Sequence, residues 1–143
     1  MAAEDLTRVG INNQKRGVCV AVVRGLTEAQ ILTTGCIPFK LPEKSGILSI
    51  RVNVTTVSST GSSTVDVQYG AVGEVVANEI AVTAAGLIAG TIVAGKAYLA
   101  VGGNITILAG ATPPAAGDLV CDLIVEYVEL DKLSGEYTNY YEA

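Results

Sequence analysis

The chain has 143 residues, half of them hydrophobic, and 9 basic against 14 acidic residues give it a formal net charge of −5. This length fits a single domain with a core that needs no disulfide or metal to hold it. The sequence contains no histidine, which excludes Ser-His and Cys-His nucleophile pairs and removes the commonest metal ligand. It also lacks a dense Lys/Arg run interleaved with aromatic residues, so we expect no nucleic-acid partner.

Charge is distributed unevenly along the chain. Residues 1–51 carry seven basic and four acidic residues, a net of +3, whereas residues 52–143 carry two basic and ten acidic residues, a net of −8. Such asymmetry suits an assembly in which the basic end of one copy meets an acidic neighbour. Solvated faces of one isolated domain would give the same pattern.

The first 16 residues are polar and follow neither a helical nor a strand period, which predicts an N-terminal arm. Acidic residues come early in this arm and no apolar run follows them, so no signal peptide is expected. A basic arm can reach a neighbouring subunit. Its candidate interface residues are Arg8, Lys15 and Arg16.

The apolar run VCVAVVRG, which follows Gly17, predicts a strand buried on both faces. Residues 26–34 fit either a helical turn or a strand, and we expect a turn followed by a strand. Residues 37–41 contain Pro38, which cannot donate to a ladder, so they are expected to form an edge strand or an extended loop.

The cleanest alternation of apolar and polar residues lies between residues 46 and 70. Its first strand would turn inward Leu48, Ile50, Val52 and Val54. After a Ser-rich turn, the second strand would turn inward Val65, Val67 and Tyr69, and outward Asp66 and Gln68. Together they predict an antiparallel hairpin from Leu48 to Tyr69 with one buried face and one face in solvent.

Glycine interrupts residues 71–95, where a helix would lose about 1 kcal/mol at each Gly relative to Ala. Short strands at 80–83 and 87–93 are therefore favoured over a helix, with a long edge loop around 71–79. Strands at 98–101 and 105–108 flank Gly102-Gly103, a pair suited to a two-residue hairpin turn. The uncharged stretches 80–95 and 97–117 lack about 20 continuous helix-compatible residues, so no membrane span is expected.

The last predicted strand covers residues 118–130 and is followed by a short tail. Its core-facing residues would be Leu119, Cys121, Leu123, Val125 and Tyr127. The opposite side interleaves Asp122 and Glu126 with three apolar candidate interface residues, Val120, Ile124 and Val128. A side that is half apolar is expected to be covered by another sheet or by another subunit.

The tail, residues 131–143, carries tyrosines that offer contact area with a polar tip. It either contacts a partner, docks on its own domain or is disordered. Its candidate interface residues are Tyr137, Tyr140 and Tyr141.

No combination of residues predicts a catalytic, cofactor-binding or metal site, and we expect no enzyme. Neighbouring members of the set Asp118, Asp122 and Glu126 would lie roughly 13 Å apart along a strand, beyond the spacing of a glycosidase pair. The cysteines, Cys19, Cys36 and Cys121, have no metal-binding spacing and are expected to be reduced structural thiols.

Eight to ten short strands with frequent turns predict an all-β fold, an antiparallel jelly-roll-like β-sandwich over residues 17–130. The extended N- and C-terminal segments, residues 1–16 and 131–143, would lie outside this body.

The alternating residues 48–69, the Ala/Gly/Thr-rich middle and the segment YLAVGGNITILAGATPPAAGDLVCDLIVEYVEL together resemble the capsid decoration (cement) proteins of tailed bacteriophages. The resemblance covers residues 17–130 in size and composition. It implies a structural virion protein, made in the host cytoplasm, that binds the outer capsid surface and clamps neighbouring coat subunits. Its implied partners are the major capsid protein and further copies of itself, as a homotrimer first and a homodimer second. The alternative is a head- or tail-fibre-type module that binds a receptor or a glycan.

Overall fold

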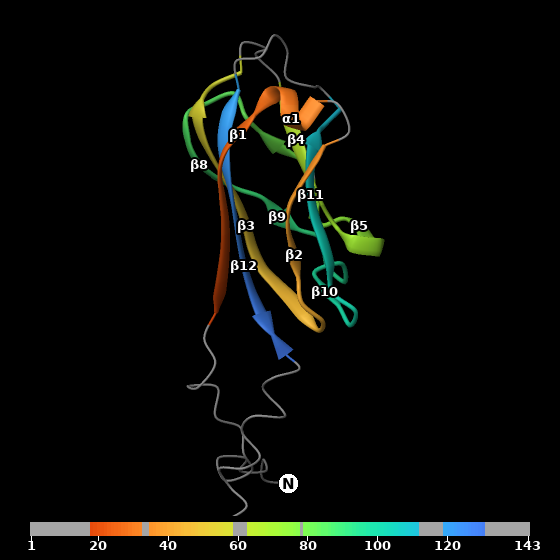
Figure 1. Ribbon diagram of the computed structural model, residues 1–143. Coiled ribbons are helices and arrows are strands. Elements are labelled where there is room, and N and C mark those ends of the chain that lie inside the picture. Colours follow the sequence, from red (N-terminus) through yellow and green to blue (C-terminus); the bar gives the residue numbers. More distant parts are fainter. Residues whose placement is uncertain (1–17, 33–34, 59–62, 78, 112–118, 131–143) are drawn as a thin grey trace, which may run out of the picture.

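The computed structural model describes residues 18–32, 35–58, 63–77, 79–111 and 119–130 (Figure 1). The predicted arm at 1–16, the tail at 131–143, most of the Ser-rich turn and the Pro113-Pro114 loop lie outside the described residues. Within the described ranges, no helix is long and apolar enough to cross a membrane.

The predicted all-β sandwich is confirmed, because two antiparallel sheets pack against each other (Figure 1). Sheet A contains β1 (Cys19–Thr27), β3 (Ser45–Thr56), β8 (Gly86–Ala89), β10 (Tyr98–Leu99) and β12 (Val120–Glu129). Sheet B contains β2 (Cys36–Leu41), β4 (Thr64–Tyr69), β5 (Gly73–Glu74), β7 (Ile80–Ala81) and β11 (Gly103–Ala109). A two-stranded sheet pairs β6 (Val76–Ala77) with β9 (Thr91–Ile92). The helical elements are α1 (Glu28–Leu32) and the 3-10 turn η2 (Gly70–Val72).

The order of the main strands is that of a jelly roll. Sheet A runs β1-β12-β3-β8, and sheet B runs β2-β11-β4-β7. Along these eight strands the chain changes sheet at every connection except that from β4 to β7, which pair with each other in sheet B. This interleaving of the first and last strands gives the two Greek keys of the fold.

The core between the sheets is made largely of the inward residues that alternation predicts. Leu119, which precedes β12, and Cys121, Leu123 and Val125 of β12 are fully buried. So are the inward residues of β4, which are Val65, Val67 and Tyr69. Tyr127 is only half-buried. The Tyr69 hydroxyl donates to the Ser45 carbonyl at 3.0 Å and so links sheet B to sheet A. Burial, with a smaller contribution from Tyr98, raises the pKa of Tyr69 to about 12, so the hydroxyl keeps its proton.

Both predicted hairpins are wrong, although their strands exist. The strand at Leu48 belongs to sheet A, where β3 pairs with β12, β8 and β10, and the strand at Tyr69 belongs to sheet B. Likewise β10 pairs with β3, whereas β11 pairs with β2 and β4. Alternation fixes which side of a strand faces the core, and strands in opposing sheets satisfy it as well as paired strands do. The Gly102 amide donates to the Leu99 carbonyl at 3.1 Å, which makes a turn that leads from sheet A to sheet B.

The turn followed by a strand that was preferred for residues 26–34 is also wrong, since β1 continues to Thr27 and the short helix α1 follows at Glu28–Leu32. The side chain of Gln30 accepts a hydrogen bond from the Thr27 amide at 2.9 Å. A Thr followed three residues later by Gln is the capping-box spacing of a helix N-terminus, so the local sequence favours a helix here over a strand. The edge strand predicted at residues 37–41 is confirmed as β2, which lies at the edge of sheet B.

Two predictions of burial in sheet A are corrected. Leu48 is 52% exposed while its neighbour Ile47 is buried, because β3 carries one extra residue between the pairs Ser49–Glu126 and Ile47–Tyr127. Such a bulge reverses the alternation beyond it. The strand predicted to be buried on both faces is β1, which lies at the edge of sheet A with one face exposed.

Candidate functional site

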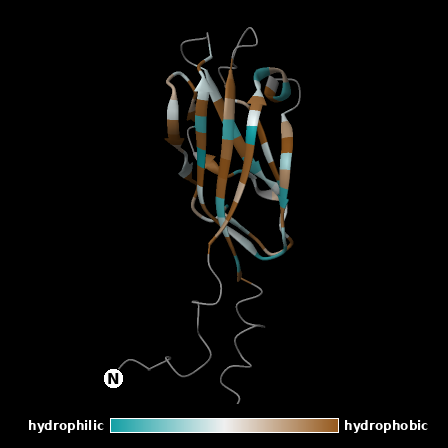
Figure 2. Ribbon diagram, turned by 60° about the vertical axis from the view of Figure 1, so that its left-hand side comes forward, coloured by the Kyte–Doolittle hydropathy of each residue, from teal (hydrophilic) through white to brown (hydrophobic). Residues whose placement is uncertain are grey.

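The outward-facing side of sheet A, which we call the outer face, gathers four of the nine exposed large apolar side chains in the described part of the chain. Figure 2 turns this sheet toward the viewer and shows long hydrophobic stretches interrupted by short hydrophilic bands. The exposed fractions are 56% for Val20, 49% for Val22, 52% for Leu48 and 59% for Leu87. Since these side chains come from β1, β3 and β8, the apolar surface extends across the whole width of the sheet.

The strand register places Ile124 at the centre of this face. Ile124 of β12 pairs with Val22 of β1 on one side and with Arg51 of β3 on the other, and Arg51 in turn pairs with Ala89 of β8. The three predicted interface residues on β12, Val120, Ile124 and Val128, are all half-buried. They lie along one side of β12. Beside them, none of the described residues covers Val22.

The acidic residues of the outer face are bonded within the face itself. Glu126 forms an ion pair with Arg51 at 3.0 Å and accepts a hydrogen bond from the Ser49 hydroxyl at 2.5 Å. Asp122 accepts hydrogen bonds from the Gly25 amide at 3.0 Å and from the Asn53 side chain at 3.1 Å. Polar groups that keep such partners can be covered at a lower free-energy cost than groups that lose hydrogen bonds to water.

The remaining predicted interface residues, Arg8, Lys15, Arg16, Tyr137, Tyr140 and Tyr141, lie outside the described residues. Conversely, sequence reasoning missed the contribution of β1 to the outer face. Because the run from Val18 to Val23 is apolar at every position, its pattern does not distinguish a central strand from an edge strand. The exposure of Leu48 depends on the bulge in β3, for which we find no signal in the sequence.

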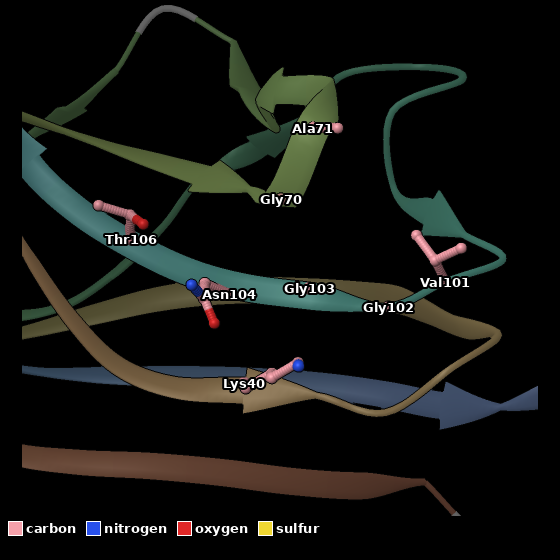
Figure 3. Close-up of a pocket in the computed structure, with 8 residues that line it drawn as sticks. All are labelled: Lys40, Gly70, Ala71, Val101, Gly102, Gly103, Asn104 and Thr106. Atoms are coloured by element: carbon pink, nitrogen blue, oxygen red, sulfur yellow. The ribbon is translucent and has the colours of Figure 1, made fainter.

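A shallow depression of about 430 Å³ lies at the other side of the molecule, beside β2, β11 and η2 (Figure 3). It is lined by the side chains of Lys40, Asn104 and Thr106 and by the glycines 70, 102 and 103, among others. Asn104 and Lys40 are paired in the strand register. Among the described residues that line the depression, Lys40 is the only ionisable one, so they provide no acid–base pair.

A group of three acidic residues sits at the edge of sheet B. Asp66 is 4% exposed, and burial, reinforced by the neighbouring Glu74 carboxylate, raises its pKa to about 6. Its Oδ1 accepts a hydrogen bond from the Val67 amide at 2.9 Å. Glu79 accepts hydrogen bonds from the Thr64 hydroxyl and, at 2.8 Å, from the Ala111 amide. Glu79 thereby ties three segments of the chain together. No set of three or more His, Cys, Asp or Glu residues in the described ranges could hold a metal ion.

The three cysteines are free thiols. Cys121 is fully buried, and burial, together with smaller contributions from Asp122 and Cys36, raises its pKa to about 12. Burial also raises the pKa of Cys36. Since the thiolate is the reactive form, neither position favours a nucleophile.

Comparisons with protein-family models, with curated proteins and with solved structures found no match for this chain.

Proposed function

We propose that this chain is a structural virion protein that binds the outer surface of a tailed-phage capsid and stabilises the assembled shell. The observation that carries the proposal is the outer face of sheet A, where exposed Val20, Val22, Leu48 and Leu87 surround carboxylates that already have partners. Exposed large apolar side chains gathered on one face of a sheet are typical of a surface that another chain covers, either a coat subunit or a further copy of this one.

The roles of the carboxylates that we can place also support a structural function. Asp122 fixes the backbone at Gly25, Glu126 holds Arg51 and Ser49, and Glu79 holds Thr64 and the Ala111 amide. Each of these groups is engaged in holding its own chain together. In the proposed function they form a rigid body that presents a contact surface.

The proposed mechanism is thermodynamic linkage. A protein that binds the assembled lattice more tightly than free coat subunits stabilises the lattice by mass action. Repeated contacts over the shell, made to the major capsid protein and between copies of this chain, would add avidity to each single contact.

The experiment uses capsids of the encoding virus that lack this chain. Purified chain is added back, and both co-sedimentation and the temperature of shell disruption are measured. We expect saturable binding at micromolar concentration, a higher disruption temperature, and weaker binding to dissociated coat subunits. If intact capsids do not bind the chain at micromolar concentration, the proposal is wrong.

A glycan-binding module is the second candidate, and the depression beside β11 favours it. Lys40, Asn104 and Thr106 offer it an ammonium, an amide and a hydroxyl group. None of the described residues that line it is aromatic, so they supply no stacking platform. A glycan-array signal that is lost in the Asn104→Ala variant would favour this candidate over the capsid protein.

A further inference from the structure

We propose that the outer face of sheet A is covered by the same face of a second copy of this chain, so that two sandwiches pack sheet against sheet in a two-fold dimer. This contact would form in the free protein. The inference therefore goes beyond the proposed function and can be tested without a capsid.

The balance of charge favours a second copy as the occupant. The outward charged residues of the face are Arg24 and Arg51 against Asp122 and Glu126, a net charge of zero. The other described residues carry three lysines against six acidic residues, a net of −3. Two copies that met through the rest of their surfaces would bring like charge together, whereas two outer faces would not.

The bonding within the face points the same way. Glu126 is paired with Arg51 at 3.0 Å, and both oxygens of Asp122 accept hydrogen bonds from groups of the same chain. These groups need no partner from the molecule that covers them. A two-fold contact places identical surfaces against each other, and such a contact requires a surface that is compatible with itself.

The size of the face is also sufficient. The face has rows of 9 residues in β1, 10 in β12 and 12 in β3, and a fourth row formed by β8 with 4 residues and β10 with 2. At about 3.3 Å per residue and roughly 4.8 Å between rows, these strands give a plane of about 600 Å². Side-chain relief increases the accessible area of such a plane, toward the roughly 800 Å² per partner of a standard interface. The apolar side chains at both margins, Val20 and Val22 on β1 and Leu87 on β8, would be buried in the contact.

The test compares Val20→Asp with Ile37→Asp. The two residues are matched, because each lies on an edge strand and their exposed fractions are 56% and 57%, but Val20 belongs to sheet A and Ile37 to sheet B. The mass of the full chain and of each variant is measured by sedimentation equilibrium across the micromolar range, with circular dichroism to check folding. A second variant, Val22→Lys, repeats the test with the opposite charge.

We expect the unmodified chain to have twice the mass of one chain and the Ile37→Asp variant to match it. Val20→Asp and Val22→Lys should weaken the dimer about tenfold or more, because each buries an unpaired charge. A monomeric unmodified chain, a mass of three chains, or equal masses for Val20→Asp and Ile37→Asp would each overturn the proposal. If the chain is monomeric and Val20→Asp abolishes capsid binding, the outer face binds the coat protein instead. If the chain is monomeric and Val20→Asp leaves capsid binding unchanged, the remaining candidates to cover the face are the chain's own termini.

Discussion

The two sheets of the sandwich have the same plan, each with one open edge strand, β1 or β2, and one edge extended by short strands, but their outward sides differ. In sheet B, the free edge of β4 is closed by β5 and β7, which bring Glu74 and Glu79 to Asp66. In sheet A, β8 and β10 extend the edge of β3 in the same way, but the outward side of the sheet exposes Val20, Val22 and Leu87. On the described strands of sheet B, Ile37 is the only exposed large apolar residue. In sheet B the chain thus covers the Asp66 carboxyl group with its own short strands. In sheet A it leaves the apolar side chains of the outer face to be covered by another molecule.

The largest loss of stability is expected from a substitution in sheet B that crowds the Glu79 carboxylate. A Cβ atom at Gly110 would lie 1.7 Å from Glu79 Oε2 and 2.2 Å from Thr64 Oγ1. Gly110→Ala should therefore displace Glu79 from Thr64 and the Ala111 amide and lower the free energy of unfolding by about 3 kcal/mol. Urea denaturation measures the loss.

The control for this change is Gly46→Ala, because a Cβ there would meet its nearest atoms at the ordinary distance of 3.9 Å. It should change the free energy of unfolding by less than about 1 kcal/mol. Equal stability of the two variants would show that Glu79 does not hold this part of sheet B.

Replacing the buried carboxyl group of Asp66 gives the next largest effect on the free energy of unfolding, and this effect depends on pH. Burial and Glu74 raise the folded-state pKa of Asp66 from 3.8 to about 6. The folded chain therefore holds this proton more tightly than the unfolded chain, so stability is greatest below about pH 4 and falls as the pH rises through 6. Asp66→Asn, which keeps an oxygen for the Val67 amide, should add about 2 kcal/mol of stability at pH 7 and little at pH 4.

Denaturation of Asp66→Asn and of the unmodified chain at both pH values checks this prediction. Glu74 and Glu79 are the acidic groups that raise the pKa of Asp66. Glu74→Gln should therefore lower this pKa and, like Asp66→Asn, make the free energy of unfolding depend less on pH. A gain that is the same at pH 4 and pH 7 would mean that Asp66 titrates normally in the folded chain.

The open side is tested by separating stability from association. Asp122→Ala removes the acceptor of the Gly25 amide and of the Asn53 side chain, so the free energy of unfolding should fall by about 1 kcal/mol. Ile124→Asp, at the centre of the outer face, should instead weaken self-association more than Asp122→Ala does. Melting temperature and solution mass measure the two effects, and variants that agree in both quantities would contradict a contact centred on Ile124.

The sequence was enough for the fold class and for most of the core, because alternation reports directly which side chains avoid water. The residues Cys121, Leu123 and Val125 on β12 and Val65 and Val67 on β4 all follow it. Alternation carries no information on pairing partners, so strands from opposing sheets at Leu48 and Tyr69 were predicted to form a hairpin. Only the contacts between distant segments, such as β1 with β12, establish the jelly-roll order.

The outer face was predictable in part for a related reason. The interleaving of Ile124 with Asp122 and Glu126 indicated a half-apolar side of β12, and the structure places all three residues there. The same strand does not reveal that Arg51 and Asn53 would lie beside these carboxylates, since that depends on the register between β12 and β3. The open edge at β1 depends on where the strand lies in the sheet, which a local pattern does not record.

The smallest effect on stability is expected for Glu126→Gln, which distinguishes an outer face exposed to water from one covered by another chain. Arg51 and Glu126 are 42% and 29% exposed, and an ion pair with that access to water contributes about 0.5 kcal/mol or less to stability. Glu126→Gln keeps an oxygen for the Ser49 hydroxyl, so the melting temperature of the variant should be nearly unchanged. In a dimer that covers the face, however, Arg51 would be buried without its carboxylate, and the dimer should dissociate more readily. Sedimentation of Glu126→Gln beside Glu43→Gln, an exposed acid in the turn between β2 and β3, measures the difference. Identical masses for these two variants at every concentration would mean that Arg51 stays in water and that the contact lies elsewhere on the molecule.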